Sequence, residues 1–153
     1  MKLFKNGELS RVVDVLLILL MIAAPILMVS LPWTIPLITD RTPGEPLFLY
    51  EKYLVILLIS GLLAELVLWQ AHGIMRNVSN GRAFSADTVR RLKVIGAECL
   101  SVGILYAVAT FLVTKFFTIV VLVTFVIVGM ILLVFSDLFR QAVEYKEEND
   151  MTI

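Results

Sequence analysis

The feature that most constrains the fold of this chain is a run of 21 residues, Phe116 to Ser136, that contains no charged side chain. A helix of about 20 apolar residues is long enough to cross the hydrocarbon core of a bilayer. Three further apolar stretches, at about 12–33, 53–72 and 94–114, have similar lengths. Lipid offers the backbone no hydrogen-bond partners, so a spanning segment of this kind must be helical. The sequence therefore predicts an all-α membrane protein with four transmembrane helices, the last at about 116–137.

Composition agrees with this prediction and limits the domain organisation. Hydrophobic residues make up 59% of the 153 residues and charged residues 17%, whereas soluble domains are about half apolar and a quarter charged. The four stretches occupy most of the chain, so we expect one domain over 1–153, folded as a four-helix bundle. The first stretch is longer than the roughly 7–15 residues of a signal-peptide core. We therefore expect it to be retained as a helix.

Proline, glycine and serine residues indicate where the helices bend and end. Pro25 should kink the first helix, because proline lacks a backbone N–H and crowds the preceding turn. Pro32 and Pro36 are expected to end that helix. Asn80-Gly81 is typical of a helix C-terminus, and Ser85 is typical of the N-cap of the next helix. The third helix should thus begin before its apolar stretch.

Basic residues are concentrated in alternate connections between the apolar stretches. Ten of the 13 Lys and Arg residues lie in the N-terminal segment, the loop 75–93 and the tail 140–153, and three lie in the other connections. Short cytoplasmic loops are enriched in Lys and Arg. We therefore expect both termini and the loop 75–93 in the cytoplasm, with helices three and four extending into it.

Glu65 is the charged residue that lies deepest in an apolar stretch. An ionised carboxylate at such a depth costs at least about 2.5–3.5 kcal/mol, so it should be paired, hydrated or protonated. The helical period places Gly61, Glu65 and His72 on one face, and Glu98 lies near the inner end of the third helix. Glu65, His72 and Glu98 form a candidate intramembrane polar site. It would be either a proton or cation site or a structural carboxylate that is hydrogen-bonded between helices.

Further charged residues lie near the predicted cytoplasmic ends of the helices. The acidic ones are Asp14, Glu98 and Asp137, and the basic ones at similar depth are Arg11, Arg90, Arg91, Lys93 and Arg140. They would form either a layer of structural ion pairs or a vestibule that binds a charged ligand. The basic segment 76–93 would also attract anionic lipid headgroups, although the positive-inside rule alone would produce it.

Motifs of known catalytic sites are absent from the sequence. It contains no Gly-x-Ser-x-Gly, no His-Glu-x-x-His and no glycine-rich phosphate loop. One histidine and one cysteine are too few for a typical zinc site or a disulfide. We therefore expect no enzymatic activity, no metal and no cofactor. The formal net charge of zero argues against direct binding of nucleic acid.

Four short motifs carry a resemblance to a known family. They are NGRxFS at 80–85, RLKxIG at 91–96, LFRQAVE at 138–144 and KEENDMTI at 146–153. With these motifs the chain resembles the bacterial membrane family known as domain of unknown function 2975, over nearly its whole length. The resemblance implies four spans, a place in the bacterial plasma membrane and no established activity. Members often sit beside a small helix-turn-helix regulator, which implies a cytoplasmic regulatory partner.

Three functions follow as hypotheses. The first is a non-catalytic membrane protein that binds a cytoplasmic partner through its inner-face loop and C-terminal tail. The candidate contact residues are Arg82, Phe84, Arg91, Arg140, Glu144, Glu147, Glu148, Asn149, Asp150 and Ile153. The second is a small transporter or ion-conducting subunit that uses Glu65 within a homo-oligomer, because one such chain leaves little room for a pathway. The third is a scaffold or immunity-type protein that packs against another membrane protein.

Overall fold

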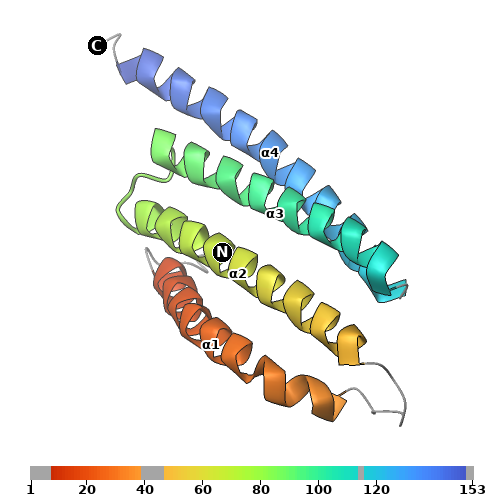
Figure 1. Cartoon of the computed structure of the whole chain (residues 1–153). Helices are drawn as coiled ribbons and strands as arrows, with labels where there is room; N and C mark the ends of the chain where they lie inside the picture. Colours follow the sequence, from red (N-terminus) through yellow and green to blue (C-terminus); the bar gives the residue numbers. More distant parts are fainter. Residues whose placement is uncertain (1–7, 39–46, 114–115, 151–153) are drawn as a thin grey trace, which may run out of the picture.

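The computed structural model describes residues 8–38, 47–113 and 116–150, and these residues form four long helices (Figure 1). The helices are α1 (Glu8–Ile38), α2 (Leu47–Ser79), α3 (Ala86–Val113) and α4 (Phe116–Asp150). Each contains a stretch that is long and apolar enough to cross a membrane: Ser10–Ile35, Glu51–Ser79, Ala86–Leu112 and Phe116–Asn149. The prediction of an all-helical protein with four potential membrane spans is confirmed.

Helix α1 passes through all its prolines and ends at Ile38, so the prediction that Pro32 and Pro36 end it is wrong. Each proline removes only one backbone donor, and the remaining groups of an apolar segment are best satisfied by continuing the helix. The hydroxyl of Thr34 donates to the carbonyl of Ser30 in its own helix, at 3.2 Å. This hydroxyl bonds within its own helix, as Ser and Thr side chains commonly do, so it does not interrupt α1. Figure 1 shows α1 as a bent helix, as expected for a proline within its length.

The four helices lie side by side in chain order (Figure 1). Within the described residues, the backbones of α1 and α2, α2 and α3, and α3 and α4 approach one another, and no other pair does. The arrangement is a single layer rather than the predicted four-helix bundle. In lipid, apolar side chains gain little by facing one another instead of acyl chains, so such a layer has no hydrophobic core to complete. The layer therefore leaves large apolar surfaces exposed on all four helices.

Helices α3 and α4 approach each other closely at two glycines. A Cβ atom added to Gly129 would lie 3.0 Å from the carbonyl oxygen of Gly96, and one added to Gly96 would lie 3.2 Å from that of Gly129. Hydrogen bonds join α3 and α4 on either side of this glycine contact. Ser136 Oγ donates to the carbonyl of Val89 at 3.2 Å, and the hydroxyls of Thr110 and Thr118 are 3.3 Å apart. Small residues allow this approach, as is usual between membrane helices.

Replacing Gly129 with valine should push α3 and α4 apart, because no side chain fits between the two backbones. Overpacking of this kind typically lowers the free energy of unfolding by about 1–3 kcal/mol. The measurement is the Tm of the purified full chain in detergent. Ala97→Val also adds apolar volume on α3, but at an exposed position, and should leave the Tm unchanged. Equal Tm values for Gly129→Val and the wild type would contradict the close contact.

Candidate functional site

Polar side chains gather where α2 turns into α3, and the local sequence determines this turn. Gly81 has a positive φ of 70°, a conformation that glycine adopts without strain. Its N–H donates to the carbonyl of Val78 at 3.0 Å, and the N–H of Arg82 donates to that of Asn77 at 2.9 Å. These two bonds are the Schellman motif that closes a helix C-terminus. Helix α3 begins at Ala86 after Ser85, whose Oγ accepts the N–H of Thr88 at 3.3 Å. The predicted stop and N-cap are confirmed.

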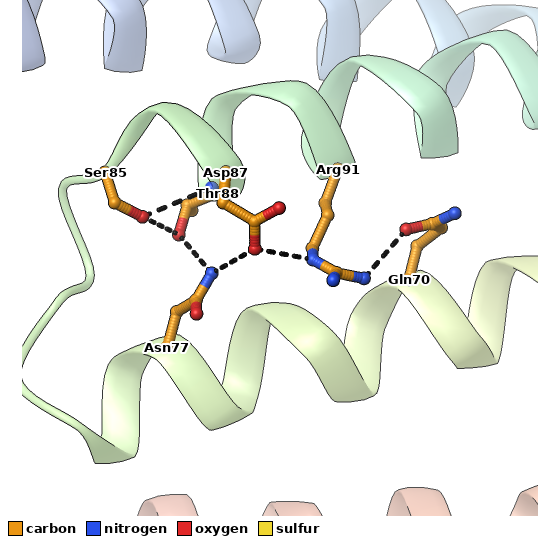
Figure 2. Close-up of polar contacts among 6 residues, drawn as sticks. All are labelled: Gln70, Asn77, Ser85, Asp87, Thr88 and Arg91. Carbon is orange, nitrogen blue, oxygen red and sulfur yellow. Dashed lines mark hydrogen bonds and ion pairs between the residues drawn. The ribbon is translucent and has the colours of Figure 1, made fainter.

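A hydrogen-bonded network joins α2 to α3 just beyond this turn, and Asn77 is at its centre (Figure 2). Asn77 Nδ2 donates to Asp87 Oδ2 at 2.8 Å and to Thr88 Oγ1 at 3.2 Å. The hydroxyl of Thr88 is also 3.0 Å from that of Ser85, and Thr88 is buried. One amide from α2 thus binds the first turn of α3 directly, and this contact positions the two helix ends.

Arg91 extends the network one turn further along α3 (Figure 2). Its Nε donates to Asp87 Oδ2 at 2.8 Å, and its Nη1 donates across to Gln70 Oε1 of α2 at 3.1 Å. The guanidinium passes directly over Gly73, since a Cβ atom added there would lie 2.8 Å from Arg91 Nε. Gly73 therefore provides the space through which Arg91 reaches α2.

A cleft of about 270 Å³ opens beside Arg91, and we call it the arginine cleft. Its lining residues are Trp69, His72, Gly73, Arg76, Asn77, Asn80, Arg82 and Arg91. Three of them carry a guanidinium group and none carries a carboxylate. Among the described residues, Arg76 and Arg82 have no carboxylate partner. The cleft therefore has an excess of positive charge.

The predicted polar face of α2 packs against α1. His72 Nδ1 lies 2.8 Å from Asp14 Oδ1, although the angles between the two groups do not meet those of a hydrogen bond. Further along, a Cβ atom added to Gly61 would lie 2.8 Å from Met28 Cγ. Glu65 lies between these two contacts on the same face, and its Oε2 is buried without a hydrogen-bond partner. The position of Glu65 on this face therefore places it toward α1.

The register between α2 and α3 sets how Glu65 and Glu98 lie relative to each other along the two helices. The hydroxyls of Ser60 and Tyr106 are 3.4 Å apart, and Gln70 accepts from Arg91, so α2 and α3 run antiparallel between these two pairs. Glu98 falls midway along this interval on α3, as Glu65 does on α2. The two residues therefore lie at a similar level along the helix pair.

The predicted layer of ion pairs is present only in part. Asp137 Oδ1 is 3.9 Å from Arg140 Nε, and both side chains are exposed. Asp14 approaches a histidine rather than an arginine. Glu98 has no basic partner among the described residues, and its Oε2 is buried without a hydrogen bond. In the part of the chain that the structure describes, no three His, Cys, Asp or Glu residues are grouped closely enough to hold a metal ion.

The candidate partner-binding residues fall into two groups that one aromatic contact connects. Phe84 of the α2–α3 turn is 51% exposed and stacks on Phe139 of α4, with ring centroids 5.4 Å apart and 24° between the ring planes. Arg82 and Arg91 line the arginine cleft. The other members lie on the exposed end of α4: Arg140, Glu144, Glu147, Glu148 and Asn149. The side chain of Asp150 and all of Ile153 are outside the described residues.

A sequence profile of the family described as Protein of unknown function (DUF2975) matches residues 16–153. The chain belongs to this family. The match includes most of α1, all of α2 to α4 and every residue of the arginine cleft. No match is found among curated proteins or among solved structures. The resemblance inferred from the four motifs is confirmed, and the family description names no activity.

The polar network and the arginine cleft of this DUF2975 protein use three residues of α2 that were not predicted: Gly73 and Asn77 line the cleft, and Gln70 accepts a hydrogen bond from Arg91 beside it. Gln70, Gly73 and Asn77 all contact α3 side chains. They recur at intervals of three and four residues in an otherwise apolar helix, which is the spacing of one helical face. That pattern was the available signal, because polar and small residues on one stripe of a membrane helix indicate contact with protein rather than lipid.

Proposed function

We propose that this DUF2975 protein is a non-catalytic, multi-pass protein of the bacterial plasma membrane that binds a cytoplasmic partner. The proposed binding surface is the α2–α3 turn together with the C-terminal end of α4. The observation that supports it is the stack of Phe84 on Phe139, which joins these two segments into one surface. A helix-turn-helix regulator, implied by the family resemblance, is the proposed partner.

The chemistry of this surface suits a protein partner. Phe84 and Tyr145 are both exposed, and exposed aromatic residues are enriched in protein interfaces. Arg140 and Glu144 add one positive and one negative charge at the same end of α4. Complementary charges on a partner would fix the position in which it docks on this surface. Helix α4 has 35 residues, about 50 Å at 1.5 Å per residue, so its end would project beyond a hydrocarbon core of about 30 Å.

Removing residues 147–153, or replacing Phe84 with alanine, should lower the recovery of the partner when the tagged full-length protein is purified from native membranes. Each change removes one half of the proposed surface. Quantitative mass spectrometry of the co-purified proteins provides the measurement. Phe111→Ala is the matched control, since Phe111 is also exposed but lies at the opposite end of α3. Unchanged recovery with both variants would refute a role for this surface.

We propose that both termini and the α2–α3 turn face the cytoplasm, which the distribution of basic residues supports. Cys99 is the only cysteine and is buried, so single cysteines added elsewhere can be labelled selectively. Glu147→Cys should react with a membrane-impermeant maleimide only after the membrane is permeabilised. Phe116→Cys, at the exposed start of α4, should react in intact cells. The reverse pattern of labelling would overturn the proposed orientation.

A second candidate function, proton or cation movement within an oligomer, is favoured by the buried carboxyl oxygens of Glu65 and Glu98. Both lack hydrogen-bond partners and lie at similar depth. A carboxylate in that situation is stabilised by a bound proton or cation, since burial of an unpaired charge in the membrane is costly. Because the described helices form a single layer, any pathway would need a second subunit to close it.

Replacing Glu65 with glutamine should abolish proton uptake by vesicles that contain the purified protein, because the amide cannot take up a proton. Uptake would be followed with a pH-sensitive dye under an imposed membrane potential. Glu51→Gln, at an exposed position near the start of α2, should leave the rate unchanged. If the Glu65→Gln and wild-type proteins take up protons equally, the carboxyl group of Glu65 has a structural role only.

A further inference from the structure

We propose that the arginine cleft is a binding site for an anionic phosphate ester. Neither the family description nor the proposed partner surface assigns a ligand to this cleft, and the inference does not depend on either. It depends on the charge of the lining side chains, on how Arg91 is held, and on the residues that continue from the cleft along α2.

The charge of the cleft favours an anion. Arg76, Arg82 and Arg91 all line a space of about 270 Å³, and no carboxylate lines it. Asp87 is the carboxylate of the hydrogen-bonded network, and it already accepts hydrogen bonds from Arg91 and Asn77. Like charges that share one partly enclosed space repel each other. A phosphate group would relieve this repulsion, since guanidinium groups bind its oxygens through paired hydrogen bonds.

Arg91 is positioned before any ligand arrives. Its Nε and Nη1 are bonded to Asp87 and Gln70, while Nη2 makes no hydrogen bond among the described residues (Figure 2). A guanidinium has five N–H donors, so donors remain for a ligand. The close approach over Gly73 fixes the plane of the group. A donor that is already ordered loses less conformational entropy when a ligand binds.

The surroundings of the cleft indicate that the ester is amphiphilic. Leu62, Leu66 and Trp69 are all exposed. They lie on the same stripe of α2 as Arg76 and Asn80, since the spacings are three, four or seven residues. This stripe changes from apolar to cationic toward the α2–α3 turn. Trp69 lies at the transition, where tryptophan is favoured at a membrane interface. The headgroup of an anionic phospholipid would fit the cleft while its acyl chains follow the two leucines.

The same phosphate chemistry could be supplied by a soluble molecule, so the experiment needs two probes. In a Trp33→Phe background, Trp69 is the single tryptophan and its fluorescence reports on the cleft. The purified full chain in neutral detergent is titrated with phosphatidylglycerol in phosphatidylcholine micelles and, separately, with inorganic phosphate. The Arg76→Gln/Arg82→Gln variant should raise the apparent Kd by about fivefold for each arginine removed. Arg91 is left unchanged, because its hydrogen bonds also join α2 to α3.

The matched control is Arg90→Gln/Lys93→Gln, which removes two positive charges from exposed positions outside the cleft. Its apparent Kd should change by less than about twofold, because neither side chain lines the cleft, although both are exposed like Arg76 and Arg82. Weaker binding of phosphatidylglycerol alone identifies a lipid ligand, and weaker binding of inorganic phosphate alone identifies a soluble one. If both weaken, the site recognises the phosphate from either source.

If the cleft variant and the control variant raise the apparent Kd equally, the proposal is wrong, because the probes would then be attracted by the overall positive charge and not by the cleft. Unchanged binding by the cleft variant would overturn it as well. The Arg76→Lys/Arg82→Lys variant keeps both positive charges, so it tests the site even if the glutamine variant misfolds. It should recover part of the affinity but not all, because lysine lacks the two-pronged geometry of a guanidinium. Full loss of binding in this variant, with its Tm unchanged, would also contradict the proposed site.

Discussion

The architecture depends on one constraint, which is that backbone groups in hydrocarbon must find their hydrogen bonds within their own helix. Each described helix meets this condition by itself, so the helices have no need of a shared core. Helix α1 continues through its prolines for the same reason. The constraint also explains why an open layer of helices is an acceptable fold here, although the same layer in water would expose a large apolar surface.

Since apolar burial contributes little between membrane helices, each neighbouring pair relies on a different specific contact. Helices α3 and α4 use the close approach of Gly96 and Gly129. Helices α2 and α3 use hydrogen bonds, of which those of Asn77 are the most direct. Helices α1 and α2 meet where His72 approaches Asp14 and where Met28 covers Gly61. Polarity increases toward the end of α2 and α3 at which the arginine cleft forms.

Periodicity and cap residues were sufficient to predict the helices, the stop at Gly81 and the N-cap at Ser85, because these features depend on local sequence alone. The row of helices could not be predicted, since a helical face shows that a contact exists but not which helix supplies it. The similar level of Glu65 and Glu98 could not be predicted either, because apolar length does not define the register between α2 and α3. The site was foreseen in part, through His72, Arg82, Arg91 and the basic segment 76–93. Gly73 was missed because its role depends on a side chain from another helix.

The arrangement of helices in a row has a consequence for how the molecule comes apart. Stability in such an array is approximately a sum of terms between nearest neighbours, as in repeat proteins. Helix α1 is held by a single interface with α2, so its loss would leave the other two interfaces intact. A force applied at the N-terminus would therefore extract the helices one after another rather than all together. The arginine cleft, which α2, α3 and their turn supply, would survive the first of these steps.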